Sequence, residues 1–518
     1  MAIQLTRRGT MAGLAAAGLL TAAPASAQQN GTNATAISFP GLIGDGQRFD
    51  ASLVVDLARA LSKRPMVPNP ADLPDGLGAL SLDAMAGIRL QPQAMIWAGE
   101  SRGFVIEPLH RGSIFSQSVS LFVVEEGIVR RIAFDKSRFD YGRTPVPASQ
   151  SDLGFSGFRL HVAGERLQDV AVFQGATFFR AMARGQMFGA VARSLVLRPG
   201  EQRGEEVPYF RGFWIERPGP AAPVLTVHGL IDSDSATAAV RMTIRPGDMT
   251  INDIELTLFA RTQLDNVGFG GMLGSFLFAP QRRRVFDDVR PAVHEISGLQ
   301  LRTGADEWVY RPLNNPEQLQ ISAFVDNNPK GFGLVQRERD SNAYQDDDQR
   351  FELRPSVWVE PLGDWGPGTV QLLEVPTDSE INDNIIAHWR PRQPIAAGSE
   401  TTMSYRQFWC WQPPETPPVA IVRSVRQGRG SQGRRRRFFV DFAGDALADP
   451  ALGANVKVIL SATPGTINGM RLVPYPERRT MRVSFELDPG GENACELRLQ
   501  LDVAGKPISE TWLNRWTP

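Results

Sequence analysis

The chain has 518 residues, of which 42% are hydrophobic and 21% charged, and its formal net charge is −1. This length suggests two domains or more, and this composition is typical of a folded protein and not of a disordered one. The near-neutral charge argues against nucleic acid as a partner. Two cysteines, Cys410 and Cys495, are too few for a disulfide framework, although an exported chain could pair them.

The first 27 residues have the layout of an export signal. Arg7 and Arg8 precede a short apolar stretch, which ends in a small-residue cleavage site at Ala25 and Ala27. The stretch is too short and too rich in glycine and alanine to anchor in a bilayer. The paired arginines favour the twin-arginine route for folded proteins, and a Sec-type signal is the alternative. We expect a mature chain that begins near Gln28 and works in a bacterial periplasm.

Helical periodicity is rare and strand patterns dominate. Over residues 50–64 the apolar side chains recur on one helical face, with Asp50 placed to cap the helix and Pro65 to end it. A second, short helix is predicted over 178–186. Residues 119–134 alternate in polarity around a turn, which predicts a hairpin. Many short strands with glycine and proline between them favour sandwiches or barrels over a doubly wound sheet.

A proline-rich stretch at 412–418 is the best candidate for a domain linker. It would separate a large domain of residues 28–411 from a small immunoglobulin-like sandwich of residues 419–518. The small domain carries an arginine-rich segment at 423–437. The simpler interpretation is a basic hairpin loop between strands, and the functional one is contact with anionic lipid or a partner protein.

Two segments concentrate carboxylates, at residues 286–295 and 336–391, and the second interleaves them with tryptophan and arginine. Aromatic faces stack on sugar rings and charged groups bind hydroxyls, so this composition suits a sugar cleft. Paired carboxyls can also divide acid and base work at a glycosidic bond. The structural alternative is that single acids cap turns and that the tryptophans lie in the core.

Nine short motifs, in order along the chain, together resemble one family. They lie at residues 139–142, 154–161, 172–180, 204–208, 213–218, 328–334, 354–361, 363–366 and 382–386. In these motifs the chain resembles the osmoregulated periplasmic glucan biosynthesis family, types G and D, over nearly all of its mature length. The twin-arginine signal makes it look more similar to the D type.

The resemblance implies an all-β fold, with a large galactose-mutarotase-like β-sandwich followed by the immunoglobulin-like one. It also implies a periplasmic enzyme, a hydrolase or transglycosylase that acts on β-1,2-glucan with inversion at the anomeric carbon. No metal or organic cofactor is expected. The implied partners are the β-glucan itself, a membrane glucan synthase and a second copy of the chain.

The resemblance also assigns roles to two carboxylates. Asp383 matches the general acid of the family, and a desolvated site or a neighbour such as Glu380 would raise its pKa. On sequence alone, an Asx turn is the simpler role for Asp383. Glu295 is the candidate base, although relatives usually have the shorter aspartate there. Asp287 and Asp288 are the alternatives, and their structural role would be a turn paired with a nearby arginine.

Five further residues are candidates for a proton relay or for sugar contact. Tyr344 and Asp346 match a family segment that could carry a relay or hold the sugars. Arg339, Trp358 and Trp365 are candidates for sugar contact, and each could instead be structural. Ala343 stands where many relatives have histidine, which argues against a relay through an imidazole there. A rival function is a non-catalytic scaffold that binds nascent glucan with the same residues.

Overall fold

The computed structural model describes residues 44–68, 71–74, 76–146, 152–280, 286–449, 452 and 455–518. The predicted export signal and the start of the mature chain lie outside these residues. Within the described part, no helix combines the length and the apolar character needed to cross a membrane. The helices are α1 (Ala51–Ser62) and α2 (Leu82–Ala86), with short 3-10 turns at η2 (Pro92–Ala94), η3 (Lys136–Arg138), η5 (Ser341–Ala343), η6 (Phe351–Leu353), η7 (Asp445–Ala448) and η9 (Pro476–Arg478).

Ten strands form the first large sheet. They are β2 (Phe104–Leu109), β6 (Gly157–Val162), β7 (Gln168–Gln174), β8 (Phe178–Ala181), β9 (Val191–Arg193), β10 (Val196–Leu197), β15 (Val267–Gly274), β20 (Gln320–Asn327), β23 (Pro367–Glu374) and β24 (Ile385–Pro391). Their order is β2-β6-β7-β8-β9-β15-β24-β23-β20, with β10 beside β15. The sheet therefore joins strands from distant parts of the chain.

Fifteen strands form the second sheet. They are β3 (Ser120–Glu125), β4 (Ile128–Arg131), β11 (Tyr209–Glu216), β12 (Leu225–Asp232), β13 (Ala236–Arg245), β14 (Thr250–Ala260), β18 (Gly298–Arg302), β19 (Trp308–Pro312), β21 (Gly331–Val335), β22 (Ser356–Leu362), β25 (Glu400–Cys410), β28 (Lys457–Thr463), β31 (Cys495–Val503), β32 (Lys506–Pro507) and β33 (Thr511–Trp516). Their order is β28-β31-β33-β19-β18-β21-β22-β25-β14-β13-β12-β11-β3-β4, with β32 beside β31. The predicted hairpin is confirmed as β3 and β4.

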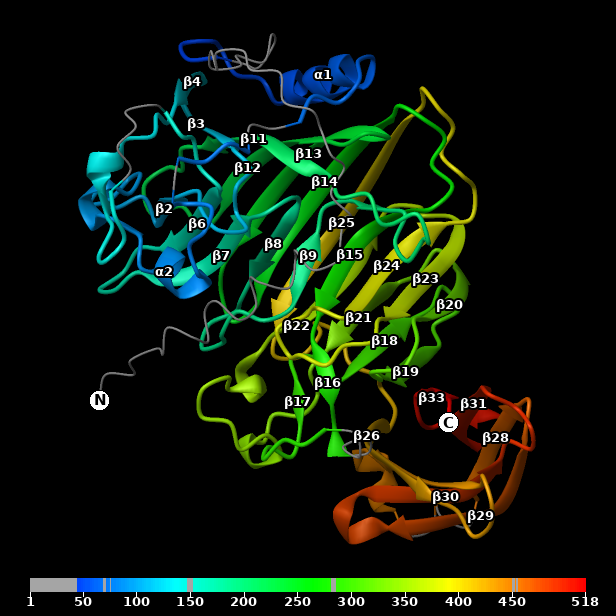
Figure 1. The fold of residues 1–518 in the computed structure, drawn as a ribbon. Helices are drawn as coiled ribbons and strands as arrows, with labels where there is room; N and C mark the ends of the chain where they lie inside the picture. The colour runs from blue at the N-terminus through cyan, green and yellow to red at the C-terminus, as the bar shows by residue number, and fades with distance from the viewer. Residues whose placement is uncertain are drawn as a thin grey trace.

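The two sheets pack face to face around one large apolar core, as the layers in Figure 1 show. Phe173 of the first sheet meets Phe213 of the second with ring centroids 5.7 Å apart, and Phe179 meets Trp409 at 5.6 Å. Each such side chain contributes about 1.5–3 kcal/mol by leaving water. The predicted all-β sandwich is therefore confirmed.

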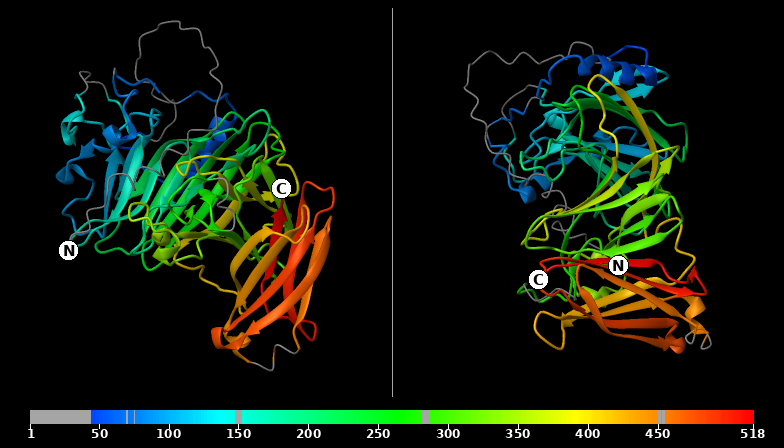
Figure 2. Two further views of the ribbon diagram at one scale, coloured as in Figure 1. Left: turned by 60° about the horizontal axis from the view of Figure 1, so that its bottom comes forward. Right: turned by 90° about the vertical axis from the view of Figure 1, so that its right-hand side faces the viewer.

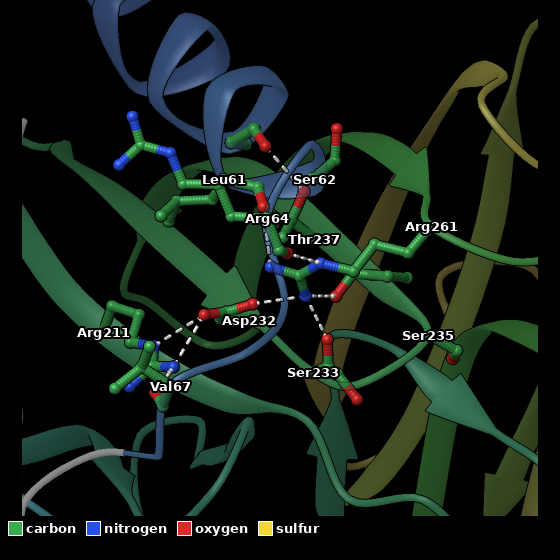
Figure 3. A network of polar contacts seen from close by, with 12 residues as sticks. Leu61, Ser62, Arg64, Val67, Arg211, Asp232, Ser233, Ser235, Thr237 and Arg261 are labelled. Atoms are coloured by element: carbon green, nitrogen blue, oxygen red, sulfur yellow. Dashed lines mark hydrogen bonds and ion pairs between the residues drawn. The ribbon is translucent and has the colours of Figure 1, made fainter.

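The predicted first helix is confirmed as α1, which packs on the outer side of the second sheet. Asp50 caps it by accepting from the Ser52 N–H at 2.8 Å. Figure 3 shows what holds its other end. Arg261 donates to the carbonyl oxygens of Leu61 and Arg64, both at 2.8 Å, and to Asp232 at 2.6 Å.

The second predicted helix, at 178–186, is wrong, because residues 178–181 form β8. All four side chains of β8 are buried, and they lie alternately on the two faces of the sheet. Phe179 and Ala181 join the core between the sheets, whereas Phe178 belongs to a separate cluster on the opposite face. Side chains that point alternately to two buried faces favour a strand over a helix.

The last hundred residues form a small sandwich at the end of the molecule opposite α1 (Figures 1 and 2). Its outer sheet contains β26 (Ile421–Arg429), β27 (Arg436–Ala443), β30 (Thr480–Asp488) and β29 (Thr466–Tyr475), in that order. Its other layer is β28, β31 and β33, which extend the fifteen-stranded sheet because β33 pairs with β19. Cys410 and Cys495 are both buried and free, so they do not form a disulfide.

Two short pairs complete the fold. They are β1 (Arg89–Leu90) with β5 (Phe139–Asp140), and β16 (Phe276–Phe278) with β17 (Val293–His294). The second pair matters for function, because Glu295 follows β17 directly.

Candidate functional site

The candidate site lies on the face of the ten-stranded sheet that points away from the core. In β7 and β8, Phe173 and Phe179 face each other in register and both belong to the core. Because side chains alternate along a strand, Arg180 lies on the opposite face. Arg193 of β9 pairs in register with Phe178, so it shares that outer face. Arg180 and Arg193, both buried, therefore lie on the same outer face of the sheet.

Asp383 is half-buried and stands at the start of β24, where its neighbour Asn384 fixes the backbone. The Asn384 side chain accepts from the Phe276 N–H at 2.8 Å and donates to the Phe276 carbonyl oxygen at 3.1 Å. It also donates to the Val375 carbonyl oxygen at 3.0 Å. This amide ties three segments together, so the position of Asp383 is set by buried hydrogen bonds.

Glu295 is brought to the same place by the β16–β17 pair. Its backbone N–H donates to the Ser275 carbonyl oxygen at 3.0 Å, and its side chain is buried. One carboxylate oxygen is 3.9 Å from Arg354 Nη1, and the other has no hydrogen-bond partner among the described residues. A buried carboxylate oxygen without a partner is costly, so a hydroxyl or water is the natural partner for it.

Burial lowers the pKa of the Arg180 guanidinium, and the nearby negative charges of Asp383 and Glu295 oppose this fall. Among the described residues no hydrogen bond or ion pair restrains its guanidinium. Arg354 differs, because it donates to the Phe188 carbonyl oxygen and, at 3.1 Å, to Gln349 Oε1. Arg180 is therefore the cation available to a bound ligand.

The surroundings of Asp383 change its acidity. Burial and the negative charge of Glu295 raise the pKa of Asp383 to about 7, against the opposing charges of Arg180 and Arg193. Such a carboxyl carries its proton for a substantial fraction of the time at neutral pH. It can therefore donate that proton to an oxygen, which is what a general acid does.

Glu380 is not the neighbour that raises this pKa. It forms an ion pair with Arg290, which also binds Asp288 and Asp346 at 2.7 Å each. These contacts, hydrogen bonds to Asp288 first, raise the pKa of Arg290. Asp288, Asp346 and Glu380, which were predicted for the site, thus all bind Arg290 and hold their loops together.

Asp287 is exposed and belongs to the same turn. Asp288 accepts from the Arg290 backbone N–H at 2.9 Å and from its Nε at 3.0 Å. This is the turn-and-arginine arrangement that was the structural alternative for the aspartate pair. Glu295, and neither of these two, is the carboxylate that acts on Asp383.

Tyr344 lies in a small core cluster and not on the open side of the site. Its ring packs against His294 at 5.1 Å and Phe351 at 5.7 Å, and its hydroxyl donates to the Glu338 carbonyl oxygen at 3.4 Å. Burial raises its pKa, so the phenol keeps its proton. Its contact with His294 supports the segment that carries Glu295.

The three residues predicted for sugar contact are placed in structural roles. Arg339 donates to the carbonyl oxygens of Glu352 at 2.9 Å and Trp411 at 2.9 Å, so backbone groups occupy its guanidinium. Trp358 is buried against Trp308, with centroids 6.1 Å apart. Trp365 is also buried, and its N–H donates to the Ser404 carbonyl oxygen at 3.1 Å. A saccharide would not reach either tryptophan in this conformation.

Sequence reasoning did not nominate Arg180, Arg193 or Arg354 for the site. Arg180 ends one of the motifs that carried the family resemblance, and Arg354 begins another, so the signal was present in the sequence. What could not be read there is that the fold brings these arginines, two on strands and one after a 3-10 turn, close to Asp383 and Glu295.

Fold and site together define the class: an all-β protein with a buried acid and arginine cluster on the outer face of its ten-stranded sheet. A family model described as "Periplasmic glucan biosynthesis protein, MdoG" matches residues 49–516. The chain belongs to this family, whose description places its members in the periplasm and in glucan biosynthesis. The family resemblance is therefore confirmed.

Three curated relatives are named glucans biosynthesis protein G. That of Rhodopseudomonas palustris (strain BisA53) is 42% identical over 518 residues, covering 99% of this chain and 100% of that protein. That of Bradyrhizobium diazoefficiens is 40% identical, with 99% of each chain covered. That of Vibrio cholerae serotype O1 (strain ATCC 39541) is 40% identical, covering 90% and 87%.

These names correct the expected closeness to the D type. That expectation came from the export signal, which is a small part of the chain, whereas identity over the whole length favours the G type.

Two solved structures show a weak likeness. One is the GH36 alpha-galactosidase AgaA from Geobacillus stearothermophilus, with 9% identity, a TM-score of 0.25, and coverage of 49% of this chain and 39% of that one. The other is a galactose mutarotase related enzyme from Lactobacillus acidophilus, with 8% identity, a TM-score of 0.20, and coverage of 46% and 95%. At such scores neither adds to the argument.

Proposed function

We propose that this protein is a periplasmic enzyme that cleaves or transfers glycosidic bonds of β-1,2-linked glucan, with Asp383 as general acid. The observation that carries the proposal is the meeting of Asp383, Glu295 and Arg180 on one sheet face. Two carboxylates in different environments, beside an arginine free to bind a ligand, suit glycosidic chemistry. Membership of the glucan biosynthesis family supports the substrate class.

In this proposal each group has one task. Asp383, whose pKa lies near 7, protonates the leaving glycosidic oxygen. Glu295 accepts a proton from the attacking water or sugar hydroxyl through its unpartnered oxygen. Arg180 donates hydrogen bonds to sugar hydroxyls of the bound substrate, or stabilises the negative charge of Asp383 and Glu295. Attack from the face opposite the leaving group gives inversion at the anomeric carbon.

The test is incubation of the purified mature protein with linear β-1,2-glucan, followed by chromatography of the products. Asp383→Asn keeps the shape but removes the acidic proton, so we expect turnover to fall about 100-fold or more. Asp378→Asn is the matched control, because Asp378 is an exposed aspartate five residues earlier. It should behave like the wild type.

Two outcomes would contradict the proposal. Equal turnover by Asp383→Asn and wild type would remove Asp383 from the chemistry. Tight glucan binding by both proteins without any product would favour the non-catalytic scaffold, which delivers glucan from a membrane synthase. A shift of products toward longer chains would identify transfer in place of hydrolysis, and the role of Asp383 would stand.

A further inference from the structure

A second feature lies on a different sheet from the glucan site, the outer sheet of the C-terminal sandwich. Side chains from all four strands and from η9 build an alternating row of cations and aromatic rings. The Arg426 guanidinium is 5.4 Å from the centroid of the Phe439 ring, and Arg482 is 5.6 Å from the same ring. Arg482 is also 5.4 Å from the Tyr475 ring, and Arg478 is 5.5 Å from it.

This row, the arginine ladder, is defined as Arg426, Phe439, Arg482, Tyr475 and Arg478. Each ring lies between two guanidinium groups, so neither ring is free to stack on a sugar. The rings instead space the cations nearly evenly across the sheet.

One negative charge of the ladder is covered and a second is exposed. Asp441 binds Arg482 at 2.6 Å and Arg426 at 3.2 Å, but its side chain is only 11% exposed. The side chains of Arg426 and Arg478 are 50% and 71% exposed. Arg478 also lies 3.6 Å from Glu477, whose side chain is 65% exposed. The exposed cations outnumber this one exposed acid, so the surface that a partner meets is positive on balance.

Exposed apolar side chains lie beside the ladder on β29. Val473 is 37% exposed and pairs in register with Arg482, and Met470 is 46% exposed. Arg471, between them, is also exposed. A flat sheet face that combines repeated arginines with exposed apolar groups has the composition of an interfacial membrane-binding surface.

The arginine run at 434–437 is bound to acids and carbonyl groups of the same sheet, although Arg437, two residues before Phe439 on β27, lies on the same face as the ladder and is 52% exposed. Arg435 pairs with Asp488 at 2.9 Å, Arg437 donates to Glu486 at 3.0 Å, and Arg434 donates to the Glu492 carbonyl oxygen at 2.9 Å. These contacts hold the hairpin to its own sheet, as the simpler interpretation of the segment expected. Only Arg426 of the ladder lies in the arginine-rich segment at 423–437, so this segment does not mark the ladder as a whole.

We propose that the arginine ladder docks the protein on an anionic phospholipid surface, with lipid phosphates accepting from the guanidinium groups. A membrane fits because it repeats one anionic group in a plane, as the ladder repeats one cation along a sheet. An acidic protein would need a shaped complement, for which the even row of identical groups gives no features. Docking through this sheet leaves the glucan site free, because the ladder and the site belong to different sheets and share no residue.

The test is sedimentation of the mature protein with vesicles of phosphatidylcholine, with or without about one third phosphatidylglycerol. We expect binding only to the anionic vesicles, and weaker binding as salt rises. The triple variant Arg426→Ser, Arg471→Ser, Arg478→Ser should bind at least tenfold more weakly, since each basic residue adds to the attraction. It retains Arg482, so Asp441 keeps a partner and the sheet should fold.

Two further variants keep the test sharp. The same three positions changed to lysine keep the charge and should keep most of the binding. A control triple, Lys63→Ser, Arg130→Ser, Arg143→Ser, removes as many exposed charges from the other end of the chain and should bind like the wild type.

The proposal is overturned if the wild type ignores anionic vesicles, or if the serine triple binds them as well as wild type does. If the serine triple and the control triple lose vesicle binding equally, the binding depends on net charge alone, and the proposal is also overturned. If the wild type binds an immobilised acidic protein but does not bind vesicles, the partner of the ladder is not a lipid surface. Asp383→Asn should leave vesicle binding unchanged, so failure here and failure of the proposed enzyme are separate results.

Discussion

Neighbouring carboxylates in this protein differ because their partners differ. Glu380 and Asp346 are neutralised by Arg290, which holds them as braces. Asp383 has Arg180 near it, yet burial and the charge of Glu295 prevail and raise its pKa to about 7. A carboxyl fixed to an arginine stabilises a loop, whereas one kept partly protonated can act as an acid.

This raised pKa predicts a pH-dependent change in stability. The native state holds the Asp383 proton more tightly than the unfolded chain does, so between pH 3.8 and about 7 wild-type stability falls as the pH rises. Asp383→Asn carries no such charge and should be more stable than wild type at pH 8. We expect a gain on the order of 2 kcal/mol, since one pKa unit is about 1.4 kcal/mol and solvent screens part of the charge.

Urea unfolding at pH 4 and pH 8 measures this difference. Near pH 4 the wild-type carboxyl is protonated, so the two proteins should differ little. Asp378→Asn should show no such dependence on pH. The same stability difference at both pH values would mean that the native Asp383 has an ordinary pKa.

The sequence located the two carboxylates of the site through motif resemblance but not their surroundings. Asp383 and Glu295 were nominated, and the structure brings them within reach of each other's charge. Trp358 and Trp365 were nominated from composition, which cannot tell a tryptophan that lines a cleft from one that fills a core. Arg180 was overlooked, since its partners come from strands more than a hundred residues further along the chain.

At the scale of elements, side-chain networks decide where the helix and the strands sit. The periodicity of residues 50–64 and the cap at Asp50 predicted α1 well, because both signals are local. Residues 178–186 were misjudged, since a short apolar stretch fits a helix or a strand equally and only the partner strands decide. These local signals did not predict which elements α1 packs against.

The Asp232 carboxylate is predicted to anchor the end of α1. It is buried between Arg211 and Arg261, each at 2.6 Å, and Arg261 in turn binds the carbonyls of Leu61 and Arg64 (Figure 3). Asp232→Asn leaves two buried guanidinium groups without their anion and should cost about 3–5 kcal/mol of unfolding free energy. Cleavage by a protease within residues 61–67 should become faster as this end of the helix loosens.

Asp248→Asn is the control for this prediction. Asp248 also pairs with an arginine, Arg184, but the two side chains are 88% and 70% exposed, so its loss should cost less than about 0.5 kcal/mol. Urea unfolding and limited proteolysis compare the variants. Unchanged proteolysis in Asp232→Asn would show that apolar packing alone holds α1.

At the scale of the whole molecule, the sheet crosses the predicted linker. The proline-rich stretch at 412–418 separates two sandwiches in sequence, yet β33 pairs with β19 across it. A pairing between residues about 200 apart leaves no local trace in composition or periodicity. The small sandwich therefore lies fixed against the large one, which gives the arginine ladder a defined orientation relative to the glucan site.

Glu510 is predicted to hold this junction together. It is fully buried, accepts from Arg337 at 2.6 and 2.9 Å, and accepts from the Val422 N–H at 2.6 Å. The Arg337 guanidinium stacks on Tyr310 of β19 at 3.6 Å, so one carboxylate connects both sandwiches. Glu510→Gln leaves this arginine without its anion, and we expect a loss of about 3–5 kcal/mol.

Calorimetry should show wild type unfolding in one transition, because the continuous sheet couples the two sandwiches. In Glu510→Gln the midpoint should fall, and the small sandwich should separate as an earlier transition, since the coupling and not the large core is weakened. Glu496→Gln is the control. Glu496 also pairs with an arginine, Arg515 at 3.4 Å, but its side chain is 60% exposed, so this substitution should leave the unfolding curve unchanged. A single transition at the wild-type midpoint in Glu510→Gln would mean that the β19–β33 pairing carries the coupling without the ion pair.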